Sequence, residues 1–167
     1  MATTSQTYNV VMANQTVIAD GELVTLRAAT AWASRASMLE ILRVTVSQQG
    51  TSTSQQLGIR FGLKASAFGT FTAATPVPSS LGTVASAITG STSNAASSAG
   101  VDASANGAGT LTVYHQEGFN NLNGYLWVPV PEERILVGPD LTFLVQLQGT
   151  PTTLTGWNAI VTFSELT

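Results

Sequence analysis

The sequence has no cysteine, a single histidine and few charged side chains among its 167 residues. Without cysteine, the chain has no disulfide, no thiolate zinc site and no cysteine nucleophile. Charged residues make up 9% of the chain, whereas ordinary globular domains contain about 25%. The net charge is −3 and the six basic residues form no cluster. Binding to nucleic acid through phosphate neutralisation is therefore not expected.

Long apolar runs and targeting signals are also lacking. No segment approaches the roughly 18 apolar residues that a membrane-spanning helix needs. The start, Met1 to Thr7, has neither the basic region nor the apolar region of a signal peptide. We therefore expect a protein that is made in a cytoplasm without an export signal and has no membrane partner.

What the chain does contain is typical of β-structure. It has 16 Ser, 24 Thr and 44% hydrophobic residues, and its length suits one domain. Alternation is clearest from Leu57 to Leu63, where every second residue is apolar. Further strands are expected at 22–28, 38–47, 110–116, 125–130, 134–137, 141–147 and 157–163.

One stretch is ambiguous. The alanines between residues 28 and 36, followed by Met38, Leu39 and Leu42, suit a helix on propensity alone. The segment 38–47 nevertheless alternates and ends in β-branched residues, which favours a strand, with a loop or short turn at 29–36. Strands separated by turns, without a credible long helix, predict an all-β sandwich or barrel.

The domain organisation follows from composition. Residues 1–20 are polar with two short strand-like pieces, and we interpret them as an extended N-terminal arm. Residues 21–167 form the predicted β-sandwich domain. Within it, we expect a low-complexity excursion at about 83–109, because from Gly90 to Gly109 the chain is almost entirely Ala, Ser, Gly, Thr and Asn. That excursion is either a plain flexible loop or a contact with a subunit or partner.

Reactive side chains are scarce. His115 is the only histidine, and no nucleophile-elbow motif accompanies it, so a surface or partly buried strand histidine is favoured over a catalytic one. Glu132 and Glu133 are adjacent, and in extended chain they would point to opposite faces. We expect one of them to stabilise a turn with Arg134 as its ion-pair partner. No catalytic residue, metal site or cofactor is predicted.

The aromatic residues allow a second kind of site. Together they could form a sugar-binding platform, although aromatic residues on strands more often belong to the core. They are Trp32, Trp127, Trp157, Tyr8, Tyr114 and Tyr125.

Three segments carry a resemblance to a known class. They are residues 117–134 (Glu117-Gly118-Phe119 through Pro131-Glu132-Glu133-Arg134), residues 39–48 (Leu39-Glu40-Ile41 through Ser47-Gln48), and the ending Phe163-Ser164-Glu165-Leu166. Together they resemble small all-β structural proteins of tailed bacteriophages, in particular capsid cement or decoration proteins, over roughly 37–64 and 110–166. The resemblance implies a jelly-roll-like β-sandwich on the outer capsid surface of the virion. It also implies a homotrimer that binds the major capsid protein and has no catalytic residues.

Attachment to the partner is expected to rest on apolar burial, because so few charges are available. The predicted arm would supply the contact, with Tyr8, Val10 and Val11 as anchors. Other interpretations remain open: a tail or fibre component, a carbohydrate-binding β-sandwich, or an enzyme of unknown type.

Overall fold

A computed structural model of the chain describes residues 6–28, 38–50, 53–65, 69–80, 85–91 and 98–166. Its elements are strands, apart from one 3₁₀ turn, η2 (Pro131–Glu133), within the described residues. The strands are β1 (Gln6–Gln15), β2 (Glu22–Arg27), β3 (Met38–Gln48), β4 (Gln56–Lys64), β5 (Thr70–Ala73), β6 (Val77–Pro78), β7 (Thr89–Gly90), β8 (Ser98–Ala105), β9 (Thr112–Asn120), β10 (Tyr125–Trp127), β11 (Ile135–Val137), β12 (Thr142–Gln148) and β13 (Trp157–Leu166).

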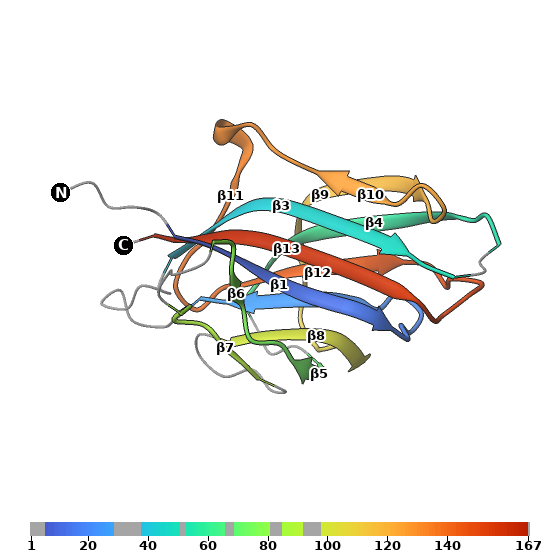
Figure 1. The fold of residues 1–167 in the computed structure, drawn as a ribbon, viewed down its shortest axis with the longest axis horizontal. Coiled ribbons are helices and arrows are strands. Elements are labelled where there is room, and N and C mark those ends of the chain that lie inside the picture. The colour runs from blue at the N-terminus through green and yellow to red at the C-terminus, as the bar shows by residue number, and fades with distance from the viewer. Residues whose placement is uncertain are drawn as a thin grey trace.

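The strands form two sheets packed face to face, which confirms the predicted all-β sandwich (Figure 1). The first sheet has the order β10-β3-β13-β1-β6, with β11 also paired to β3. The second has the order β5-β8-β2-β12-β4-β9, with β7 paired to β8. Pairing is antiparallel except between β7 and β8.

The connectivity is that of a jelly roll. When β5 to β8 are set aside, the chain alternates between the sheets from β1 to β4 and stays in the second sheet for β9. It then crosses to the first sheet for β10 and β11, which both pair with β3, and alternates again through β12 to β13. Long connections of this kind place the first strand beside the last, in two interlocked Greek keys. The segment between β4 and β9 is thus an insertion that widens both sheets at one side.

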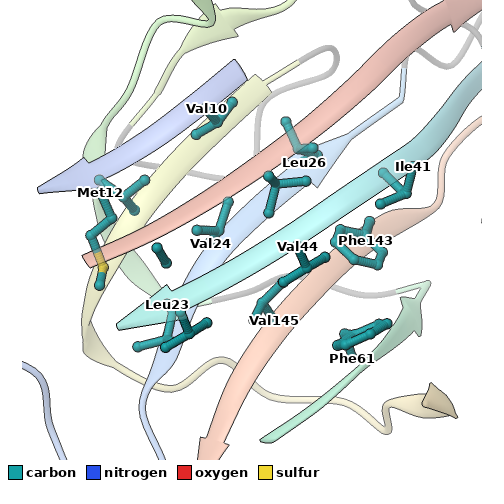
Figure 2. Close-up of a cluster of buried hydrophobic side chains, with 14 of the residues drawn as sticks. Val10, Met12, Leu23, Val24, Leu26, Ile41, Val44, Phe61, Phe143 and Val145 are labelled. Carbon is teal, nitrogen blue, oxygen red and sulfur yellow. The ribbon is translucent and has the colours of Figure 1, made fainter. Parts of the chain in front are cut away.

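The core lies between the sheets and takes alternate residues from both. Figure 2 shows this cluster, to which the first sheet contributes Val10, Met12, Ile41 and Val44, and the second Val24, Leu26, Phe61, Phe143 and Val145. All of these side chains are buried. Burying one of this size contributes about 1.5–3 kcal/mol. The interior is therefore the main source of stability.

Residues 1–20 are not an extended arm where the structure describes them. Gln6–Gln15 form β1, which pairs with β13 from Gln6↔Glu165 onward and with β6 on its other side. Tyr8 and Val10 point into the core and are fully buried. The alternation of Tyr8, Val10 and Met12 gives β1 one apolar face, and burying that face against the second sheet outweighs the polar composition of the segment.

The prediction of a low-complexity excursion at about 83–109 is also partly wrong. Ser98–Ala105 form β8, whose Ala99, Val101 and Ala103 are buried. Small side chains permit this packing: a Cβ at Gly100 would lie 2.7 Å from Cβ of Phe71. Residues 81–84 and 92–97 of the excursion and its surroundings lie outside the described residues.

Most of the other predicted strands are confirmed. The segment 38–47 is β3, the alternating segment around Leu57 to Leu63 is β4, and 141–147 and 157–163 correspond to β12 and β13. The segment 125–130 is shorter than expected, since β10 ends at Trp127. The loop expected at 29–36 lies outside the described residues.

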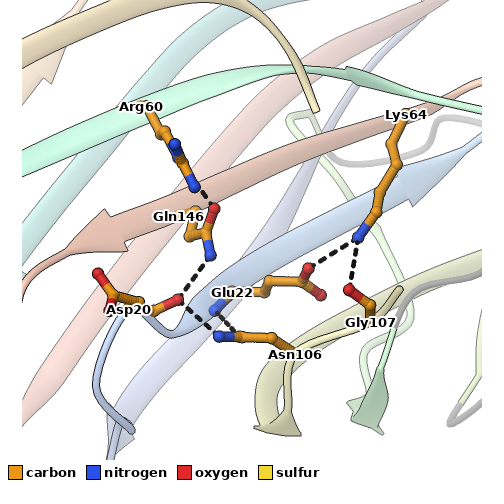
Figure 3. A network of polar contacts seen from close by, with 7 residues as sticks. All are labelled: Asp20, Glu22, Arg60, Lys64, Asn106, Gly107 and Gln146. Carbon is orange, nitrogen blue, oxygen red and sulfur yellow. Dashed lines mark hydrogen bonds and ion pairs between the residues drawn. The ribbon is translucent and has the colours of Figure 1, made fainter. Parts of the chain in front are cut away.

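The outer face of the second sheet carries a buried ion pair (Figure 3). Lys64 of β4 donates from Nζ to Oε1 of Glu22 on β2 at 3.1 Å and to the carbonyl of Gly107 at 3.1 Å. Both side chains are almost inaccessible, at 3% and 2% exposure. Gly107 belongs to the connection from β8 to β9, residues 106–111. That connection therefore passes over this face.

Two further contacts fix the same connection. Asn106 accepts a hydrogen bond from the Glu22 amide at 3.1 Å and donates from Nδ2 to the Asp20 carbonyl at 2.9 Å. At its other end, a Cβ on Gly62 would lie only 2.0 Å from the Thr112 carbonyl oxygen. Glycine at position 62 thus lets the chain enter β9 directly above β4.

Candidate interaction site at the edge strands

The expected anchors Tyr8, Val10 and Val11 do not form a surface. Tyr8 and Val10 lie in the core, where the Tyr8 ring packs 5.7 Å from that of Phe163 between centroids. Val11 alone is exposed, on the outer face of the first sheet. A partner could reach Tyr8 or Val10 only by unfolding β1.

Four exposed apolar side chains lie elsewhere, on the edge strands β10 and β11 of the first sheet and on the segment between them. We call this set the apolar edge: Leu126, Val128, Val130 and Leu136, which are between 52% and 65% exposed. Leu126 and Leu136 are paired with Thr45 and Glu40 of the same strand, β3. The sequence signal for these side chains was the run from Tyr125 to Val130, in which adjacent residues are apolar. A strand of a two-sheet sandwich buries only one face against the core, so the apolar side chain on its other face remains in solvent.

Beside the apolar edge, an aromatic cluster reaches from the core to the surface. The His115 ring of β9 stacks on Phe61 at 4.8 Å and lies 6.0 Å from the Trp127 ring of β10. His115 Nε2 and the Tyr125 hydroxyl share a hydrogen bond of 2.6 Å. Glu117 lies 3.4 Å from the same Nε2. These contacts join the edge strands of the two sheets, β9 and β10.

A β-bulge in β9 decides which side chains face this junction. Phe61 is paired with His115 and Gly62 with Val113, so Tyr114 has no partner in β4. The bulge places the His115 ring against Phe61, whereas Val113 is exposed. Bulges commonly re-aim side chains beside functional sites. Here the bulge leaves the Tyr114 ring exposed next to His115.

The junction contains a pocket of about 300 Å³. It is lined by Tyr114 and His115 of β9, Trp127 of β10, Glu133 of η2 and Ile135 of β11. These residues come from both sheets, so the pocket opens where the two sheet edges meet. Sequence reasoning could not bring Glu133 next to Tyr114, because their approach depends on the packing of the two sheets.

The prediction that Arg134 forms an ion pair with Glu132 or Glu133 is wrong. Nη1 of Arg134 lies 3.3 Å from Oε1 of Glu40 on β3, and no described cation pairs with Glu132 or Glu133. The backbone is not extended here either, since Pro131–Glu133 form the 3₁₀ turn η2. Proline favours such a turn by fixing its own φ.

The six aromatic residues considered for sugar binding do not form one platform. Tyr8, Tyr125 and Trp157 are buried, whereas Trp32 lies outside the described residues. Tyr114 and Trp127 remain, and both line the pocket. Among the described residues, no group of three or more His, Cys, Asp or Glu could hold a metal ion. No helix in this part of the chain has the length and apolar character to cross a membrane.

Burial raises the pKa of the Tyr125 phenol far above its ordinary value, and the nearby Glu117 carboxylate raises it further. The unfolded chain then ionises Tyr125 at a lower pH than the folded chain does. The stabilisation from the neutral phenol is complete below about pH 10 and is lost progressively above it.

We expect urea melts at pH 8 to 11 to show this directly. The free energy of unfolding should fall more steeply above pH 10 in the natural protein than in Tyr125→Phe, which cannot ionise at this position. Parallel profiles for the two proteins across that range would contradict the burial of the phenol.

In comparisons with known proteins, no protein-family model, no curated protein and no solved structure matches the chain.

Proposed function

We propose that the chain is a non-enzymatic structural protein of a bacteriophage virion, which decorates the outer capsid surface and bridges neighbouring capsid subunits as a homotrimer. Its partner is the major capsid protein. The observation that carries the proposal is the apolar edge, where four large apolar side chains in a chain with few charges are more than half exposed. A resemblance to decoration proteins also supports the proposal. It is carried by three segments: β3, the stretch from β9 through η2, and the end of β13.

The apolar edge suits protein contact on physical grounds. Contiguous exposed apolar surface commonly marks an interaction site. Few lysines and glutamates need to be desolvated when such a surface is buried. A protein that binds the assembled shell but not loose subunits shifts the assembly equilibrium towards the shell. Burial at the edge would therefore reinforce a capsid without any chemical step.

Two other functions have support of different strength. A tail or fibre component would use the same apolar edge, and its position in an imaged particle distinguishes it from a decoration protein. A carbohydrate-binding sandwich is favoured only by the pocket with Tyr114 and Trp127 at its wall. Binding on a glycan array would support that second function.

The apolar edge predicts a specific loss of attachment. We expect Leu126→Asp to reduce co-sedimentation with undecorated particles by at least tenfold, because it places a charge in the buried contact at a cost above about 1.4 kcal/mol. Val77→Asp is the matched control. Val77 is 56% exposed on β6, at the opposite edge of the same sheet, and Leu126 is 65% exposed.

Both variants should keep the thermal midpoint of the natural protein, since both sites are at the surface. Equal loss of attachment in the two variants, or none in Leu126→Asp, would contradict a contact through the apolar edge. A cryo-electron reconstruction of the decorated particle tests the remaining parts of the proposal. Copies on the tail, or single copies on the capsid, would contradict the decorating trimer.

A further inference from the structure

The pocket between β9 and the β10–β11 edge has features that the apolar edge does not explain. Its walls are the rings of Tyr114, His115 and Trp127, and its one carboxylate is Glu133. A purely apolar contact would need no carboxylate there. The combination of aromatic faces with one anionic group selects a particular ligand chemistry.

Charge is the first argument. Among the described residues, three lysine or arginine side chains form ion pairs away from the pocket: Arg27 with Asp140, Lys64 with Glu22 and Arg134 with Glu40. Each of these cations is thus held by a carboxylate elsewhere. Glu133 has no such partner among the described residues, and its neighbour Glu132 adds a second uncompensated negative charge on η2. Glu133 therefore gives the pocket lining one carboxylate that has no cationic partner among the described residues.

Ring geometry is the second argument. The His115 ring is fixed by stacking on Phe61 and by its bond to the Tyr125 hydroxyl. The Trp127 ring is fixed by an edge contact to Phe61, with centroids 4.8 Å apart. The bulge leaves Tyr114 exposed at the rim. Aromatic faces attract a cation placed within about 6 Å, and tryptophan does so most strongly.

Size is the third argument. The volume of about 300 Å³ is at the lower limit of ligand pockets. It suits the end of one side chain rather than several sugar units in a row. The pocket and the apolar edge lie on opposite faces of the same two strands, because Trp127 and Ile135 alternate with Leu126 and Leu136 along β10 and β11.

We infer that this pocket binds a cationic group, the guanidinium or ammonium of a basic side chain carried by the partner protein. The identification of the carrier as a protein rests on the proposed function, whereas the cationic chemistry rests on the pocket itself. Glu133 would form the charge-assisted hydrogen bond, and Tyr114 and Trp127 would contact the face of the group. The apolar edge would then supply area and the pocket would set the register of docking.

The test uses N-acetyl-arginine amide and N-acetyl-lysine amide as probes, followed by Trp127 resonances in NMR titrations. Its neutral control is N-acetyl-norleucine amide, and methyl glycosides form a separate arm. We expect saturable shifts with the cationic probes and at least about tenfold weaker binding of the neutral one. Glu133→Gln should weaken the cationic probes by about tenfold, whereas Glu132→Gln, adjacent but outside the pocket lining, should change binding less than twofold.

Equal binding of cationic and neutral probes, or tighter binding of glycosides, would overturn the inference, as would an unchanged affinity in Glu133→Gln. Co-sedimentation with particles addresses the proposed function separately. Saturable cation binding by a protein that attaches to no particle would leave the pocket standing and remove the capsid role. Attachment to particles without any cation binding would keep the capsid role and overturn the inference about the pocket.

Discussion

A chain that lacks residues 1–15 is expected to lose cooperative unfolding altogether. The deletion removes β1, which lies between β13 and β6 and supplies Tyr8, Val10 and Met12 to the core. Aromatic-to-alanine changes in a core cost about 3–5 kcal/mol each, and whole domains have only about 5–15 kcal/mol of stability. Circular dichroism during a thermal melt should show no sigmoidal transition.

Substitutions at the adjacent residues Val10 and Val11 compare the contribution of the buried face of β1 to stability with that of its exposed face. Val10→Ala should lower the free energy of unfolding by about 2 kcal/mol, because Val10 is fully buried. Val11→Ala should lower it by less than about 0.5 kcal/mol, since Val11 is exposed on the other face. A truncated protein that unfolds cooperatively, or equal costs for the two valines, would restore the interpretation of this segment as an arm.

The second large effect is expected at the buried ion pair. Lys64→Met leaves the Glu22 carboxylate buried without its cation, and we expect a loss of about 3–5 kcal/mol in urea denaturation. Glu22→Gln leaves Lys64 buried without its anion and should be similarly costly. The double variant should be much less destabilised than the sum of the two, because no unpaired charge remains.

An exposed ion pair of the same protein provides the control. Arg27 and Asp140 lie 3.0 Å apart, but Asp140 is 59% exposed. Asp140→Asn should cost less than about 1 kcal/mol, and asparagine also tolerates the positive φ of this position, which is 62°. Additive single and double variants at Glu22 and Lys64 would show that the two charges are not coupled in the folded protein.

Alternation in the sequence predicted the strands that have one apolar and one polar face. The segment around Leu57 to Leu63 is the clearest example, and it became β4. β8 could not be predicted in this way, because Ser98–Ala105 contains only one large apolar residue. β8 forms a strand because it pairs with the edge of β2, and because its small residues, such as Gly100, leave room for the Phe71 side chain.

β1 was mispredicted for a different reason. Its alternation was visible, but its polar residues suggested solvent on all sides. The ladders with β13 and β6, which satisfy its backbone, cannot be read from a local window.

The candidate site was harder still to predict. Tyr114 and Trp127 were considered together as part of a sugar-binding platform, but Glu133 was considered separately, as a residue that stabilises a turn. What brings them together is the bulge at Tyr114 and the meeting of two sheet edges, which depend on long-range register. Local patterns carry no information of that kind. The apolar edge, by contrast, is visible in the sequence, because adjacent residues in the run that precedes Pro131 are apolar.

The pairing of β1 with β13 also sets the order of events during folding. Gln6 is paired with Glu165, so β1 leaves the ribosome well before the strand that pairs with it, β13. Until β13 emerges, the apolar face of β1 has no permanent cover, and contacts so distant in sequence form slowly. Nascent chains of this protein should therefore depend on chaperones or on low local concentration to avoid pairing β1 with another copy.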